Sequence, residues 1–130
     1  MTSHSPNDAG NQLDYSIIIP AYNEEELLPK TLEALTTARS KISALEGECI
    51  VVDNQCTDNT SAVAKRYGCR VVIEPIRQIS RARNTGAKAA KGESLIFVDA
   101  DTIVPSETFK QALDALLGGD IICGLSLIHI

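Results

Sequence analysis

Residues 16–28, SIIIPAYNEEELL, contain the pattern that decides the fold. Its first four residues belong to a short, mainly apolar run, Tyr15–Ile19, in which apolar and polar residues do not alternate. Continuous apolar runs of this kind are typical of strands that are buried on both faces of a parallel sheet. Pro20 ends the run, and Asn23 followed by Glu26 has the spacing of a capped helix start. The stretch therefore predicts a strand, a turn and a helix in succession.

The same succession recurs along the rest of the chain. Further apolar runs lie at Cys49–Val52, Arg70–Ile73, Ser94–Val98 and Asp120–Cys123. Residues at helical spacing lie between or after them, at Leu28–Ile42, Thr60–Tyr67, Ser80–Lys91 and Phe109–Leu117, with Gly68 and Gly118-Gly119 as stops. In the third helical stretch Ala82, Gly86 and Ala89 form a face small enough to lie close to a sheet. Alternating strands and helices predict an α/β fold with an open, mostly parallel sheet flanked by helices.

Composition and charge exclude several classes of protein. The chain has 130 residues, 44% of them hydrophobic, and we expect no membrane segment because no apolar stretch approaches the required length of about 20 residues. Twelve Lys and Arg against 17 Asp and Glu give a net charge of −5, so we expect no nucleic-acid partner. Residues 1–13 form a polar tail without a secretory signal, and the four cysteines lack zinc-site spacing. We therefore expect a cytoplasmic protein with reduced thiols.

The residues that directly follow the predicted strands are the candidates for a site, because open parallel sheets bind ligands beyond the carboxyl ends of their strands. Asp99 and Asp101 follow one run, and residues two apart in extended backbone point the same way. Two carboxylates with room for water suit Mg²⁺ or Mn²⁺, whose other positions a diphosphate could fill. The alternative is a solvated acidic turn.

Asp53, at the end of another run, has two interpretations. Its carboxylate could accept hydrogen bonds from a nucleotide base or ribose, or it could form an Asx turn into the next loop. The segment Thr57–Thr60 most simply supplies the start of the second helix.

Basic residues cluster in one segment, which holds five of the 12 in the chain: Arg77, Arg81, Arg83, Lys88 and Lys91. Arg81 and Arg83 lie in the first turn of a predicted helix, where the helix dipole disfavours cations. An anionic partner for one of these two arginines is therefore favoured, whereas Lys88 and Lys91 are expected to be solvated.

Several familiar motifs are missing from the sequence. It has no G-x-G-x-x-G, no phosphate-binding G-x-x-x-x-G-K-[ST] and no G-x-S-x-G. The only histidines are His4 and His129, close to the two ends of the chain. A histidine-based acid–base mechanism is therefore disfavoured.

Four segments together resemble the family 2 glycosyltransferases, enzymes of the GT-A fold that transfer sugars from nucleotide-sugar donors. They are SIIIPAYNEEELL, CIVVDNQCTDNT, ISRARNTGAKAAKGE and LIFVDADT, and they stand in the family's order within residues 15–123. The resemblance implies the Rossmann-like, nucleotide-binding half of a GT-A fold, with a nucleotide-diphosphate sugar as donor, most commonly a UDP-sugar.

The resemblance also implies roles for individual residues. Pro20, Ala21, Tyr22 and Glu24 would line the pocket for the base and ribose, and Asp53 would bind one of the two. Arg83 would approach the base or the diphosphate, Asp99 the ribose or a metal-bound water, and Asp101 would ligate Mg²⁺ or Mn²⁺ directly. In place of the second Asp often found after the second strand, this chain has Asn54.

The family implies an inverting, metal-dependent transfer, for which a base must deprotonate the acceptor. Members of the family hold that base in a C-terminal half with no match here, so the catalytic residue stays unassigned and the acceptor unknown. We expect residues 14–124 to be a donor-binding part with little turnover, and residues 125–130, LSLIHI, to be a non-native or truncated end. A full-length protein could be membrane-associated. The alternative is a non-catalytic α/β nucleotide-binding or interaction module.

Overall fold

The computed structural model of the protein describes residues 13–117 and 127–128. Its elements, in chain order, are β1 (Leu13–Ala21), α2 (Leu28–Ser40), β2 (Gly47–Asp53), α3 (Thr60–Arg66), β3 (Arg70–Ile73), α4 (Ile79–Ala89), β4 (Gly92–Phe97), α5 (Ser106–Leu117) and β5 (Leu127–Ile128).

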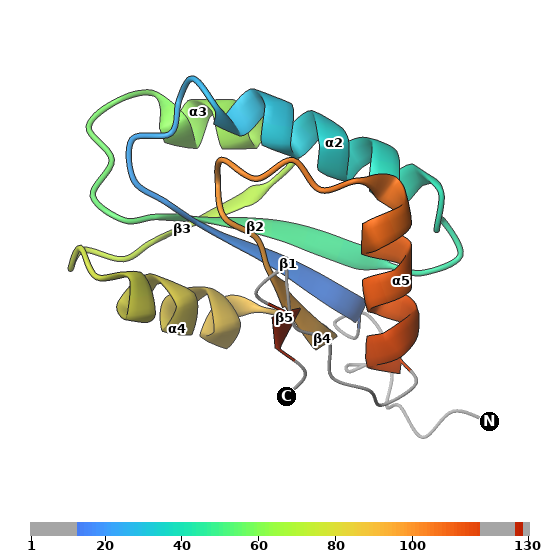
Figure 1. Ribbon diagram of the computed structural model, residues 1–130. Coiled ribbons are helices and arrows are strands. Elements are labelled where there is room, and N and C mark those ends of the chain that lie inside the picture. Colours follow the sequence, from blue (N-terminus) through green and yellow to red (C-terminus); the bar gives the residue numbers. More distant parts are fainter. Residues whose placement is uncertain (1–12, 118–126, 129–130) are drawn as a thin grey trace.

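The strands form one sheet in the order β3-β2-β1-β4-β5 (Figure 1). Neighbouring strands from β3 to β4 run parallel, and only the short β5 is antiparallel, at the edge beside β4. The prediction of an open, mostly parallel α/β sheet is confirmed. The strand predicted at Asp120–Cys123 and the helix stop at Gly118-Gly119 lie outside the described residues.

Helices cover both faces of the sheet, as the continuous apolar runs predicted. Ile17 and Ile19 of β1 point into a core shared with α2, α3 and α5, whereas Ile18 points to the opposite core, beneath α4. All three side chains are fully buried. Figure 1 shows α2, α3 and α5 on one side of the sheet and α4 on the other.

Helix α4 lies close to the sheet because its inner face is small. Ala82 and Gly86 are buried there, and a Cβ at Gly86 would clash with the side chains of Ile18 and Val52. Ala89, on the same face, is partly buried. The predicted small-residue face is confirmed.

The predicted cap of the first helix is wrong. Helix α2 begins at Leu28, and Asn23 lies before it in the left-handed region, with φ of 52°. The side-chain oxygen of Asn23 accepts a hydrogen bond from the N–H of Thr57, 34 residues away, so it does not cap its own helix. Pro29 in the first turn, where it displaces no helical hydrogen bond, marks the actual start.

The ends of two helices are informative. Helix α2 stops at Ser40, so Ile42 packs against the core from the following turn and not from the helix face that its spacing predicted. Gly68 follows α3 with φ of 81°, and the N–H of Cys69 bonds to the carbonyl of Ala64, which confirms the glycine stop.

None of the helices in the described ranges is long and apolar enough to cross a membrane.

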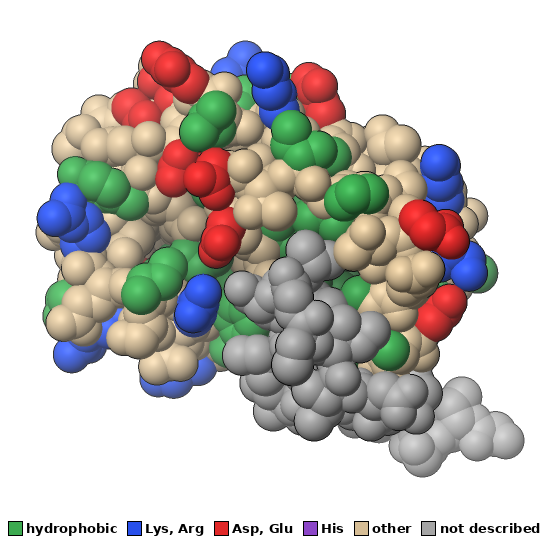
Figure 2. Space-filling model, in the orientation of Figure 1, with side chains coloured by type: hydrophobic (Ala, Val, Ile, Leu, Met, Phe, Trp, Pro, Cys, Tyr) green, Lys and Arg blue, Asp and Glu red, His purple; other side chains and the backbone are tan. Residues whose placement is uncertain are grey.

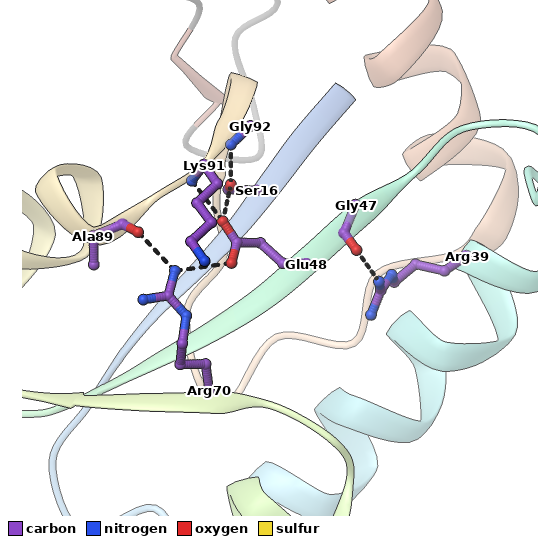
Figure 3. A network of polar contacts seen from close by, with 8 residues as sticks. All are labelled: Ser16, Arg39, Gly47, Glu48, Arg70, Ala89, Lys91 and Gly92. Atoms are coloured by element: carbon purple, nitrogen blue, oxygen red, sulfur yellow. Dashed lines mark hydrogen bonds and ion pairs between the residues drawn. The ribbon is translucent and has the colours of Figure 1, made fainter. Parts of the chain in front are cut away.

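A polar network ties the strands together at their amino ends, away from the carboxyl ends (Figure 3). One carboxylate oxygen of Glu48 accepts from the Ser16 hydroxyl at 2.7 Å and from the Lys91 N–H at 2.6 Å, and the other accepts from Arg70 at 2.9 Å. Burial raises the pKa of Glu48, but these hydrogen bonds outweigh burial and lower it. The Ser16 hydroxyl in turn accepts from the N–H of Gly92, so that β1, β2, β3 and β4 are linked.

Candidate functional site

A cleft of about 460 Å³ opens at the carboxyl ends of β1 and β4. The chain runs from β1 outward to β3 and then returns to the other side of β1 to form β4, so the strand order reverses at this point. Such switch points are where open α/β sheets bind ligands. The cleft is lined by Pro20, Ala21, Tyr22, Glu24, Asn54, Arg77, Ile79, Asp99, Ala100 and Asp101.

Most of the residues that the sequence singled out meet in this cleft. The end of β1 contributes Pro20 and Ala21, the loop after it contributes Tyr22 and Glu24, and the turn after β4 contributes Asp99 and Asp101. Asp53 and Arg83 are not among the lining residues, so their expected roles toward a nucleotide stay predictions. The cleft is also lined by Asn54, Arg77 and Ile79, to which the family resemblance assigned no role.

The acidic side of the cleft brings together carboxylates from separate loops. Burial, and then the negative charges of Asp101 and Asp58, raise the pKa of Glu24. Asp99 and Asp101 are both exposed to solvent, and the Asp99 carbonyl accepts a bond from the N–H of Thr102 at 3.0 Å, which closes the turn. A cation here would offset the negative charge that Asp101 and Asp58 place around Glu24.

A buried threonine fixes this acidic turn. The hydroxyl of Thr31, on α2, donates to the backbone carbonyl of Ala100 at 2.6 Å, and both residues are buried. This role was not predicted, because in the sequence Thr31 looks like any other residue of an amphipathic helix.

The donor set around Asp101 fits a hard cation only in part. Asp99 and Asp101 offer the carboxylate oxygens that Mg²⁺ and Mn²⁺ prefer. Within the described ranges, however, no three His, Cys, Asp or Glu side chains are grouped so that they could hold an ion. The residues therefore suit an ion that a diphosphate and water also coordinate, and not a closed protein site.

The opposite wall of the cleft is basic and aromatic. The guanidinium carbon of Arg77 lies 4.4 Å from the centre of the Tyr22 ring, a cation–π contact between the β3–α4 loop and the β1–α2 loop. Arg81, by contrast, donates to the side chain of Gln78. The sequence located the basic cluster but favoured Arg81 or Arg83 over Arg77.

Arg83 nevertheless has an unusual environment. It lies one turn beyond Ile79 on α4, and its Nε is buried without a hydrogen-bond partner among the described residues. A buried guanidinium nitrogen with no partner is costly, so an anion or water at this position would stabilise the protein.

Asp53 forms the turn that was the alternative to a nucleotide contact. One carboxylate oxygen accepts from the N–H of Cys56 at 2.8 Å and the other from the hydroxyl of Ser61 at 2.7 Å. Burial raises the pKa of Asp53, but these hydrogen bonds lower it overall. Asp53 thus shapes the loop after β2.

That loop is bonded to the loop after β1, which lines the cleft. The N–H of Asn23 donates to Cys56 Sγ at 3.3 Å, the side-chain oxygen of Asn23 accepts from Thr57 at 2.8 Å, and the N–H of Glu24 donates to the Thr60 hydroxyl at 2.9 Å. Segment Thr57–Thr60 therefore does more than start α3: it holds Glu24 at the cleft.

Opposite charges lie on the two sides of the cleft. Figure 2 shows acidic side chains near the middle of this face and above it, and basic side chains over α4. A ligand that carries both a cation and an anion, such as a metal-bound diphosphate, matches this division.

Residues 16–129 match the sequence family described as Glycosyl transferase family 2. The chain belongs to this family. Among family 2 relatives, poly(ribitol-phosphate) beta-N-acetylglucosaminyltransferase TarS of Staphylococcus aureus is 31% identical over 107 residues, which cover 77% of this chain and 18% of TarS. Glycosyltransferase AglE of Haloferax volcanii is 33% identical over 109 residues, covering 79% of this chain and 35% of AglE.

Solved structures agree with membership of family 2 and with the GT-A fold. The crystal structure of S. aureus TarS 1-349 aligns with a TM-score of 0.71 and 30% identity, over 82% of this chain and 33% of that one. Glucosyl-3-phosphoglycerate synthase of Mycobacterium tuberculosis aligns with a TM-score of 0.69 and 25% identity, over 82% and 41%. TarS 1-349 has also been crystallised with UDP and with UDP-GlcNAc. The chain thus spans well under half the length of each of these relatives.

Proposed function

We propose that the cleft binds the nucleotide-diphosphate part of a sugar donor, most simply UDP, and that the protein is a glycosyltransferase that passes the sugar to an acceptor. The observation that carries this proposal is the meeting of the β1–α2 loop with the Asp99–Asp101 turn at the switch point of a family 2 fold. The structures of TarS with UDP and UDP-GlcNAc support the choice of nucleotide.

Each wall of the cleft has its own part in binding. Tyr22 is 43% exposed and offers an aromatic ring suited to a nucleobase, and Arg77 against that ring carries positive charge for the ribose-phosphate portion. Asp101 would hold Mg²⁺ or Mn²⁺, and Asp99 would bind the ribose or a water on that ion. When bound, the ion would neutralise charge that builds on the departing diphosphate.

The remaining steps of the transfer also belong to the proposal, but no residue is assigned to them. We propose an inverting transfer, and no residue of the cleft is assigned as its base. The acceptor is unspecified, and a cytoplasmic location stays a prediction from the sequence. The chain's own contribution is to bind the donor and to orient it.

A non-catalytic module, the alternative from the sequence, would use its strand-end carboxylates only to shape loops. Asp53 does that, and so does Asp58, which accepts from the Thr60 N–H at 3.0 Å. Asp99 and Asp101 instead line the cleft, which favours the donor site.

Calorimetric titration of UDP and GDP into the purified chain, with Mn²⁺ and then with EDTA, tests the proposal. We expect UDP to bind only with the metal, and Asp101→Ala to weaken binding by at least about tenfold. Asp114→Ala is the matched control, because Asp114 is an exposed carboxylate on α5 that pairs with Lys110. Metal-independent binding, or equal losses in both variants, would contradict the proposal.

A further inference from the structure

Asn54 directly follows β2 and is 5% exposed, so its amide group is nearly withdrawn from solvent. Its Nδ2 donates to the backbone carbonyls of Glu74 at 3.0 Å and Ile76 at 2.7 Å. Both hydrogens of the amide nitrogen are thereby used. The orientation of the amide follows, because carbonyl groups can only accept.

The two carbonyls belong to the loop between β3 and α4, which forms the basic wall of the cleft. Arg77, which directly follows Ile76, and Ile79, the first residue of α4, line the cleft. Within the loop, the N–H of Ile76 donates to the Glu74 carboxylate at 2.9 Å and the N–H of Gln78 to the Ile76 carbonyl at 2.9 Å. The side chain of Asn54 therefore binds the β3–α4 loop at two backbone carbonyls, the second of which belongs to the residue before Arg77.

The backbone of Asn54 makes a separate contact, to the last residue of β1. Its N–H donates to the carbonyl of Ala21 at 3.0 Å, next to Tyr22. One residue thus connects the strand end that leads to Tyr22 with the loop that carries Arg77, and these two side chains are in contact with each other.

We propose that Asn54 is a positioning residue for the donor site: its side-chain amide holds the β3–α4 loop so that Arg77 lies over Tyr22. This inference rests on the proposed function for its consequence, nucleotide affinity, but not for the loop contact itself. An Asp at this position would have the same size but would donate to neither carbonyl, and its charge would face two carbonyl oxygens. The amide of Asn54 supplies a donor to each of the two carbonyls.

Substituting Asn54 changes the side-chain contacts and leaves the backbone bond to Ala21 available. Asn54→Asp removes both donors, and Asn54→Ala removes them without adding charge. Gln55→Glu is the matched control: Gln55 is exposed, adjacent in sequence, and its change adds the same charge at the same edge of the sheet.

Amide hydrogen exchange without nucleotide tests the loop contact directly. We expect residues 74–79 to exchange at least about tenfold faster in Asn54→Asp and in Asn54→Ala, and at the unchanged rate in Gln55→Glu. Circular dichroism confirms that each variant is folded, and the alanine variant decides the matter if the aspartate variant does not fold. Unchanged exchange in a folded Asn54 variant would overturn the inference.

A double-mutant cycle with UDP and Mn²⁺ tests the link to Arg77. If Asn54 acts through Arg77, Asn54→Ala weakens UDP binding about tenfold in the parent chain and by less than about twofold in the Arg77→Ala background. Additive losses would overturn the positioning role. If the unmodified chain does not bind UDP, the proposed function fails, while the exchange experiment still decides whether Asn54 holds the loop.

Discussion

The hydroxyl of Thr31 and the backbone carbonyl of Ala100 form a buried hydrogen bond of 2.6 Å between residues 69 apart in the sequence. Through it, the second turn of α2 supports the turn after β4, in which Ala100 separates the two aspartates of the cleft. Both the stability of the fold and the geometry of the acidic turn depend on this contact.

Thr31→Val keeps the shape of the side chain and removes the donor. We expect it to lower the free energy of unfolding by about 1–3 kcal/mol, since the Ala100 carbonyl is left buried without this partner. Urea unfolding measures the change. Thr36→Val is the control, because Thr36 is exposed and its hydroxyl, among the described residues, bonds only to the Leu32 carbonyl of its own helix. Equal losses of unfolding free energy in the two variants would contradict a specific stabilising role for the Ala100 contact.

Gly86→Ala tests the close approach of α4 to the sheet. An alanine normally favours a helix over glycine by about 1 kcal/mol, but here its Cβ would clash with Ile18 and Val52. We expect a net destabilisation of about 1–3 kcal/mol, measured by thermal or urea unfolding. Asn84→Ala, at an exposed position of α4, should change stability by less than about 0.5 kcal/mol. A stabilised Gly86→Ala variant would show that α4 packs less closely.

Glu48 predicts a defined dependence of stability on pH. Its pKa is lowered in the folded state, so its stabilising effect is fully present above the ordinary value of 4.5 and is lost as the pH falls through the folded-state value. Glu48→Gln should therefore be less stable than the parent at pH 7, by about 1–3 kcal/mol, and the two should converge below pH 4.5. Urea unfolding at a series of pH values measures the difference. A gap independent of pH would contradict the role of the carboxylate.

Arg77→Lys keeps the charge at the cleft but replaces the planar guanidinium that lies on the Tyr22 ring. We expect UDP affinity to fall by about three- to tenfold, with less loss than in Arg77→Ala. Titration calorimetry in the presence of Mn²⁺ gives the values. Arg66→Lys, at the end of α3 and exposed, is the control and should bind UDP as the parent does.

The sequence predicted the fold from local signals, and these were sufficient for the layers of the sheet. Continuous runs such as Tyr15–Ile19 implied strands buried on both faces, and the spacing of Ala82 and Gly86 implied a closely packed helix; both are confirmed. The strand-end rule brought Asp99 and Asp101 to the same cleft as Tyr22.

The predictions that were wrong or missing concern contacts between segments that are distant in the sequence. Asn23 had the spacing of a helix cap, but its side chain bonds to Thr57, which no local pattern can indicate. Arg77 reaches the cleft because Asn54 holds its loop, and the sequence shows only a cluster of basic residues there. Side-chain roles that depend on two loops meeting became visible only in the folded chain.

The position of a bound metal–nucleotide complex tests the donor site most directly. Nuclear magnetic resonance of the ¹⁵N-labelled chain, with UDP and substoichiometric Mn²⁺, maps it through the broadening of amide signals by the paramagnetic ion. We predict the strongest broadening at residues 99–102 and 20–24, the weakest at residues 47–48 and 91–92 at the amino ends of the strands, and no such pattern in Asp101→Ala. Broadening centred elsewhere, or the same pattern in the Asp101 variant, would contradict a donor site in this cleft.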